Sequence, residues 1–176
     1  MPGLMLVKGD GTTTRMDFMA GSTLADVAAN GGTSLVCSGD LDGSFGFNRA
    51  AFHPWCRTVS PDGTMGPRAE IGYRSNFLSL PVMAYGGGFA VNAAGGEQQE
   101  QVALSAVWEH LAILGLDGTI KQQFATNLPA PSGDTGAPTM VIAGGCVDLI
   151  DFDVAVYNAP DAEHSTLQRF CEAPCP

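Results

Sequence analysis

Two kinds of turn recur at a regular interval along this chain, and they constrain its fold more than any other feature of the sequence. The tripeptide Asp-Gly-Thr occurs at residues 10–12, 62–64 and 117–119, at intervals of 52 and 55 residues. A Gly-Gly pair lies between two short apolar runs at residues 31–32, 86–87 and 144–145. Both sequences favour tight turns between antiparallel strands, because glycine tolerates the positive φ that such turns need. We therefore expect repeated β-hairpins, with Gly32 and Gly87 at positive φ.

The order of the turns predicts a four-stranded unit: strand, Gly-Gly turn, strand, variable loop, strand, Asp-Gly-Thr turn, strand. The expected strands of the first unit are 24–29, 33–37, 50–59 and 65–72, and those of the second unit are 80–85, 88–93, 102–114 and 119–126. Half units add strands at 4–7, 12–18, 138–143 and 146–157. We therefore expect a single domain over 1–176, with internal repeats at about 24–79 and 80–137 that are completed by 1–23 and 138–176.

The composition supports a mostly β fold of antiparallel sheets with little helix. The 23 glycines and 11 prolines among 176 residues indicate many turns, and hence many short strands. The apolar fraction of 45% is enough for a sizeable core, so the chain is not a disordered tail. One segment leaves an alternative open, because residues 23–29 could form a short helix capped by Ser22 or Thr23 instead of a strand.

The second unit carries both turns in their most regular form. Residues 80–91 are Leu-Pro-Val-Met-Ala-Tyr-Gly-Gly-Gly-Phe-Ala-Val, and residues 113–119 are Ile-Leu-Gly-Leu-Asp-Gly-Thr. These two units resemble the blades of a bacterial β-propeller repeat family, which implies four-stranded blades around an axis. About three units cannot close a ring, since propellers have roughly four to eight blades. Either copies associate to close a ring, or the repeats belong to a β-sandwich or jelly roll.

Two of the expected strands carry a tryptophan and a histidine at matching places. His53 and Trp55 stand nine and seven residues before an Asp-Gly-Thr turn, and Trp108 and His110 do the same in the next unit. Alternate residues of a strand share a face, so each pair lies on one side of its strand. These four residues either pack as aromatics with polar tips, or form an aromatic–histidine binding site that recurs in each unit. We name them as candidate binding residues.

Two acidic clusters are weak candidates for calcium. Asp40 and Asp42 alternate as in a calcium loop, but the twelfth position from Asp40 is Ala51 rather than the glutamate that an EF-hand requires. Asp151 and Asp153 form the second cluster. The default interpretation is a solvated acidic loop in both places, and we expect no metal and no cofactor.

The five cysteines, at positions 37, 56, 146, 171 and 175, are an odd number. Without a secretory signal, an odd count favours reduced thiols. One bridge between Cys37 and Cys56 remains an alternative, because the two could lie on adjacent strands. Cys171 and Cys175 form a tail pair, free or bridged. A zinc site there would need a second pair of ligands that the sequence does not place nearby.

Charge and hydropathy limit the partners. The chain has 8 Lys+Arg against 18 Asp+Glu, a net charge of −10. Without a basic patch, we expect no nucleic acid partner and no anionic membrane surface. No apolar run reaches the roughly 18–20 residues of a membrane span, and no apolar segment typical of a signal peptide follows Met1. We expect synthesis in the cytoplasm without a signal peptide, and action in a virion or a cytoplasmic assembly.

The sequence contains no motif typical of a catalytic or nucleotide-binding site. Walker loops, a G-x-G-x-x-G after a strand, H-E-x-x-H and G-x-S-x-G are all absent, and the three histidines are scattered. We therefore expect a non-enzymatic structural protein of a virus or phage particle (coat, capsid decoration or cement, or tail), and a homo-oligomer that contacts itself or other subunits. The alternative is a propeller-type binding module, lectin-like or a protein scaffold, that recognises glycan or protein through its loops and its Trp/His positions.

Overall fold

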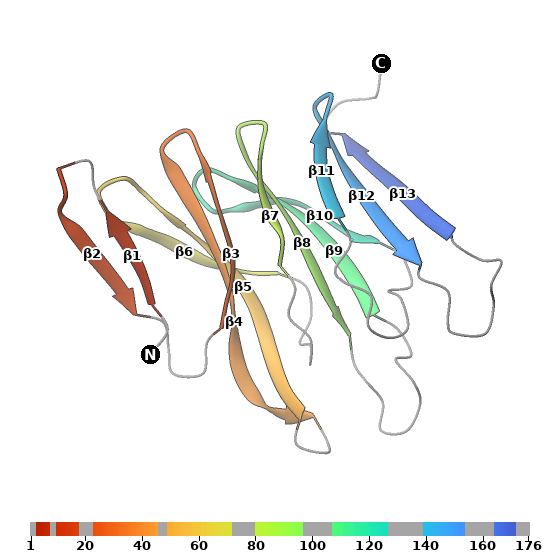
Figure 1. Cartoon of the computed structure of the whole chain (residues 1–176), viewed down its shortest axis with the longest axis horizontal. Helices are drawn as coiled ribbons and strands as arrows, with labels where there is room; N and C mark the ends of the chain where they lie inside the picture. Colours follow the sequence, from red (N-terminus) through yellow and green to blue (C-terminus); the bar gives the residue numbers. More distant parts are fainter. Residues whose placement is uncertain are drawn as a thin grey trace.

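The structure is a computed structural model, and the described residues are 3–7, 10–17, 23–45, 49–71, 80–96, 107–126, 139–153 and 164–171. These residues form an all-β fold, and no helix occurs among them (Figure 1). Eleven strands make three antiparallel sheets, and two further strands make a separate hairpin. Within this described part, no helix is long and apolar enough to cross a membrane.

The strands follow the order of the expected units, but the second strand of the first unit extends to residue 45 rather than ending at 37. The β1–β2 hairpin and the β3–β6 sheet, in the order β3-β4-β5-β6, come first. Their bounds are β1 (Gly3–Val7), β2 (Thr13–Asp17), β3 (Thr23–Asn30), β4 (Thr33–Phe45), β5 (Arg49–Val59) and β6 (Met65–Glu70). The expectation of a strand over 24–29 is confirmed by β3. The alternative of a short helix there is wrong, because pairing with β4 satisfies this segment's backbone groups.

The second sheet, β7–β10, has the order β10-β9-β8-β7, and the third, β11–β13, has the order β11-β12-β13. Their bounds are β7 (Val82–Tyr85), β8 (Gly88–Gly96), β9 (Val107–Gly115), β10 (Ile120–Thr126), β11 (Thr139–Ala143), β12 (Cys146–Asp153) and β13 (His164–Cys171). Every one of them except β13 was expected. The described strands form an open stack rather than a closed propeller ring (Figure 1).

The β7–β10 sheet lies between the other two sheets and packs on both of them. Alternate side chains of β8 point to opposite faces and show this arrangement. Phe89 and Val91 pack on one face, against Leu35 and Cys37 of the β3–β6 sheet. Ala90 faces the other way and packs with Val147 and other residues of the β11–β13 sheet. The two cores are therefore separate layers on opposite faces of one sheet, as the two-residue period of a strand requires.

Polar bonds tie the first strand of each of the first two sheets to the Gly-Gly turn of the next sheet. Asn30 Nδ2, immediately before the first Gly-Gly pair, donates to the carbonyl oxygens of Gly86 (3.1 Å) and Gly88 (2.7 Å). Tyr85, immediately before the second pair, donates its hydroxyl to the carbonyl oxygen of Gly145 (2.8 Å). Asp26 adds a bond at the same edge by accepting from the backbone N–H of Val82 at 2.8 Å. The position before a Gly-Gly pair thus links successive sheets.

The Asp-Gly-Thr turns share one set of hydrogen bonds. In all three, the carboxylate accepts from the backbone N–H and the hydroxyl of the threonine two residues later. The glycine has a φ of 82°, 90° and 81° at Gly11, Gly63 and Gly118. Gly32 also has positive φ, at 83°, but Gly87 does not. The expectation for Gly87 is wrong, because Gly86 takes the left-handed conformation in that turn with a φ of 50°.

Two disulfides correct the expectation of reduced thiols. The bridge between Cys37 and Cys56 joins directly paired residues of β4 and β5. A second bridge joins Cys146 to Cys171, which are paired in the register of β12 and β13. Cys171 is therefore bonded to Cys146 and not to Cys175, which lies outside the described residues. The cysteine count did not predict these bridges, because pairing between neighbouring strands brings the sulfur atoms together. For Cys146 and Cys171 the neighbouring strand is β13, which was not expected from the sequence.

Candidate functional site

Trp55 is the candidate binding residue whose surroundings are best defined. It lies on β5, on the face of the β3–β6 sheet that points away from the β7–β10 sheet, and it is only 6% exposed. Its indole Nε1 donates to Asp40 Oδ1 on β4 at 2.9 Å. The guanidinium of Arg68 on β6 lies over the ring, 4.9 Å from its centroid. Three neighbouring strands thus contribute one side chain each to this cluster.

Arg68 closes the cluster from the solvent side. It forms an ion pair with Asp40 and another with Glu70, where Nε lies 2.6 Å from Oε1. Burial lowers the pKa of Arg68, but the hydrogen bonds to Glu70 and Asp40 outweigh it and raise that pKa overall. A ligand such as a sugar ring would have to displace this cation from the ring. The arrangement is one of packing and charge pairing, and it favours a structural role for Trp55.

Of the other candidate binding residues, His53 lies beside the Trp55 cluster, whereas Trp108 and His110 lie on β9 of the next sheet. His53 is half-buried on β5 and lies opposite Asp40 in the register with β4. His110 on β9 is buried, and burial lowers its pKa. It shares the face of Ala112 and Leu114, which pack toward the β3–β6 sheet. Trp108 lies two residues earlier on β9, and its side chain is outside the described part.

Asn92 is a buried polar residue that sequence reasoning did not single out. Its side chain is fully buried on β8. Asn92 stands two residues after Ala90, so it lies on the same face of the strand, toward the β11–β13 sheet. Within the described part of the structure, neither atom of its amide has a hydrogen-bond partner. The signal was present, since Asn92 interrupts the otherwise apolar run from Phe89 to Ala94. Such a residue costs stability, because its amide loses water without gaining a partner.

The acidic pairs lie on strands, Asp40 and Asp42 on β4 and Asp151 and Asp153 on β12, so the expectation of solvated acidic loops is wrong. Asp40 is committed to Trp55 and Arg68. The side chains of Asp42, Asp151 and Asp153 lie outside the described part. Among the residues that the structure describes, no group of three or more His, Cys, Asp or Glu could hold a metal ion.

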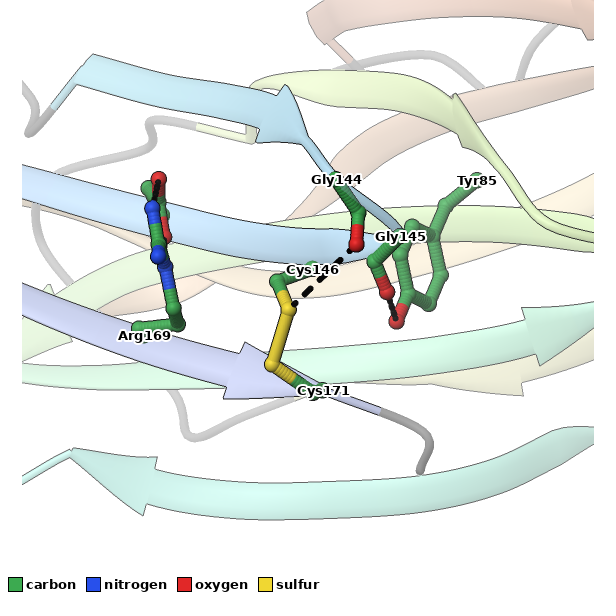
Figure 2. Close-up of a disulfide and its surroundings, with 7 residues drawn as sticks. Tyr85, Gly144, Gly145, Cys146, Arg169 and Cys171 are labelled. Carbon is green, nitrogen blue, oxygen red and sulfur yellow. Dashed lines mark hydrogen bonds and ion pairs between the residues drawn. A yellow bond between two sulfur atoms is a disulfide. The ribbon is translucent and has the colours of Figure 1, made fainter. Parts of the chain in front are cut away.

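An ion pair and a disulfide join the last two strands of the β11–β13 sheet. The guanidinium of Arg169 on β13 donates from Nε and Nη2 to both carboxylate oxygens of Asp148 on β12, each at 2.7 Å. This hydrogen bond is the main cause that lowers the pKa of Asp148. Figure 2 shows Arg169 beside the Cys146–Cys171 disulfide, together with the bond from Tyr85 to Gly145. The ion pair and the disulfide join β13 to β12, and the Tyr85 bond joins β7 to the turn between β11 and β12.

Large apolar side chains are exposed at both ends of the stack. On the β1–β2 hairpin, Met5 is 64% exposed and Val7 is 61% exposed. On the β11–β13 sheet, Leu167 is 59% exposed and Val141 is also exposed. Figure 1 places the hairpin and this sheet at opposite ends of the molecule. Other large apolar residues are exposed as well, among them Leu41 and Met65 at 49% each, and exposed apolar surface marks a docking place only where it forms a contiguous patch.

No protein-family model, curated protein or solved structure matches this chain.

Proposed function

We propose that this protein is a non-enzymatic structural protein that acts through contacts between subunits of an assembly. The observation that carries the proposal is the open stack of sheets, with exposed Met5 and Val7 at one end and exposed Leu167 at the other. Burial of such residues against another subunit supplies the stabilisation that holds assemblies together. Sheet edges add backbone donors and acceptors that a neighbouring subunit can pair.

Two further observations support this function. The polar side chains with a defined geometry, Asp40, Trp55, Arg68 and Arg169, make fixed contacts between strands that lend the sheets rigidity. The two disulfides suit a place where thiols stay oxidised, and the surface of a virus particle is such a place. We therefore specify the proposal as a coat, decoration or tail protein of a virus or phage particle.

A lectin-like or scaffold module is the competing function. It needs an aromatic ring open to a ligand, and Arg68 lies over the ring of Trp55. Glycan screening of the purified chain tests this alternative directly. Binding that is lost in the variant Trp55→Ala but retained when Arg68 is changed to Ala would favour the module over the structural protein.

The molar mass of the purified chain in solution tests the proposed function. It is measured by light scattering after size exclusion, over a range of concentrations, with and without reductant. We expect a mass well above the 18.2 kDa of one chain, rising with concentration. A strict monomer at all concentrations would contradict self-assembly. Large assemblies would be followed by electron microscopy of the same sample.

A further inference from the structure

Asn30 is the only one of the six asparagines in the sequence that is followed by glycine. Asparagine deamidates most readily before glycine, because a residue without a side chain lets its backbone nitrogen approach the side-chain carbonyl carbon of the asparagine. Asn30 is half-buried at the end of β3, and the two glycines of the turn after it are exposed, with φ of 56° at Gly31 and 83° at Gly32. Water therefore reaches the turn that holds the reacting groups.

The amide of Asn30 also joins the first sheet to the second. Its Nδ2 donates to the carbonyl oxygens of Gly86 at 3.1 Å and Gly88 at 2.7 Å, at the turn between β7 and β8. Both acceptors are backbone carbonyl oxygens, which cannot donate in return. The link therefore requires a donor at residue 30. An amide supplies one, and a carboxylate does not.

We propose that Asn30 is a deamidation site, and that its deamidation breaks this link between the β3–β6 and β7–β10 sheets. The backbone nitrogen of Gly31 bonds to Cγ of Asn30, and the Cγ–Nδ2 bond breaks. The side-chain nitrogen leaves as ammonia and takes the equivalent of the Gly31 amide proton. Water then opens the cyclic imide at either carbonyl and leaves aspartate or isoaspartate. Nothing is oxidised or reduced, and water is the only reactant consumed.

Both products place a carboxylate against two carbonyl oxygens. An ionised carboxylate only accepts hydrogen bonds, so both bonds to Gly86 and Gly88 are lost. The loss of two hydrogen bonds should lower the ratio of folded to unfolded chain by about 5- to 30-fold. Isoaspartate also inserts its Cβ into the backbone beside the turn that sets the pairing of β3 with β4.

The second junction has a link that cannot change in this way. Tyr85 holds the equivalent position before its Gly-Gly pair, and its hydroxyl donates to the carbonyl oxygen of Gly145 at 2.8 Å. A phenol has no amide to lose. Deamidation therefore acts on the junction between the first two sheets and leaves the junction between the last two intact.

The first test follows deamidation in the purified, folded protein at mildly alkaline pH, where a backbone N–H loses its proton more easily. Digestion and mass spectrometry locate the exchange of an amide for a carboxyl group, and the same chain unfolded in urea is the comparison. We expect Asn30 to convert before the other five asparagines. Its conversion should be slower in the folded protein than in urea, because two hydrogen bonds hold the amide. An Asn30 that stays intact in the folded protein while the unfolded chain converts completely would overturn the proposal.

Two matched variants test whether this junction controls the reaction. Asp26→Ala removes the other bond of the same junction, which Asp26 accepts from the backbone N–H of Val82 at 2.8 Å. Tyr85→Phe removes the bond of the second junction. We expect Asp26→Ala to speed the conversion of Asn30 and Tyr85→Phe to leave it unchanged, with thermal unfolding to confirm that both variants fold. Equal rates in the two variants would contradict the role assigned to this link.

Two substitutions at residue 30 test the consequence for stability. Asn30→Ala loses both bonds without adding a charge and cannot deamidate, whereas Asn30→Asp carries the carboxylate of one product. We expect the midpoint of urea unfolding to fall in both, and further in Asn30→Asp. An Asn30→Asp variant as stable as the wild type would overturn the proposed consequence. None of these measurements depends on self-association, so a negative result leaves the proposed structural function standing.

Discussion

Removal of the Cys146–Cys171 disulfide tests whether β13 is fastened to the rest of the fold as the structure has it. The bond closes a loop with a sequence separation of 25 residues. In the chain-entropy model, a loop of this length limits the unfolded chain enough to stabilise the folded state by about 3.5 kcal/mol. The double variant Cys146→Ser with Cys171→Ser should lose most of that stabilisation, because the register between β12 and β13 places the two residues side by side.

Urea unfolding followed by circular dichroism measures this loss. With a slope of about 2 kcal/mol per molar urea for a domain of this size, the midpoint should fall by about 1.5–2 M. Reduction of the wild-type protein should reproduce at least this shift, because it also opens the Cys37–Cys56 bridge. Alkylation followed by intact mass supplies the control: at most one of the five thiols should react before reduction.

Two results would refute this reasoning. A double variant that is less stable by under about 1 kcal/mol would mean that the loop is already restricted in the unfolded chain, or that the bond does not form. Alkylation of three or more thiols in the unreduced, folded protein would show directly that the bridges are not those of the structure. In that case the attachment of β13 to β12 would need revision.

Three smaller predictions follow from single residues. Because burial lowers the pKa of His110 below its unfolded value of about 6.5, stability should fall as the pH is lowered from 7.5 to 5.5, and the fall should be smaller in His110→Gln, as urea unfolding at both pH values would show. Gly32→Val should cost about 1–2 kcal/mol more than the matched Gly87→Val in thermal unfolding, because only Gly32 has positive φ; equal costs would contradict the turn assignment. Asn92→Leu should be neutral or stabilising by up to about 2 kcal/mol in the same assay, since it removes a buried amide without partners in the described structure, and a clear loss would indicate an ordered water or other partner there.

The strand order was predictable from the sequence because it depends on local turn chemistry. Glycine at positive φ and an aspartate that bonds the threonine two residues on are properties of three or four consecutive residues. They fix where a hairpin reverses, and the strands on either side follow from their length and apolar pattern. The strands from β1 to β12 therefore occur in their expected order, although β4 extends eight residues beyond its expected end at 37.

β13 could not be predicted in the same way, because no Gly-Gly pair or Asp-Gly-Thr turn adjoins it. Its place depends on pairing with β12, from which residues 154–163 separate it in the sequence, and this pairing is a non-local contact. The error over the cysteines has the same origin, since Cys146 meets Cys171 only once these strands are paired. The Trp55 cluster also needed the structure, because Asp40 and Arg68 come from different strands than Trp55.

The polar links between sheets bear on where a further subunit can join the stack. Asn30 and Tyr85, each just before a Gly-Gly pair, reach from one sheet to the turn of the next. Ala143 holds this position in the β11–β13 sheet, and its methyl group cannot donate a hydrogen bond. A further sheet stacked on the outer face of the β11–β13 sheet would therefore lack the link that the first two junctions have. Strand addition at the edge of β13 needs no such link, because the backbone itself supplies the donors and acceptors. Under the proposed structural function, this difference favours subunit contacts through the edge of the β11–β13 sheet over contacts through its face.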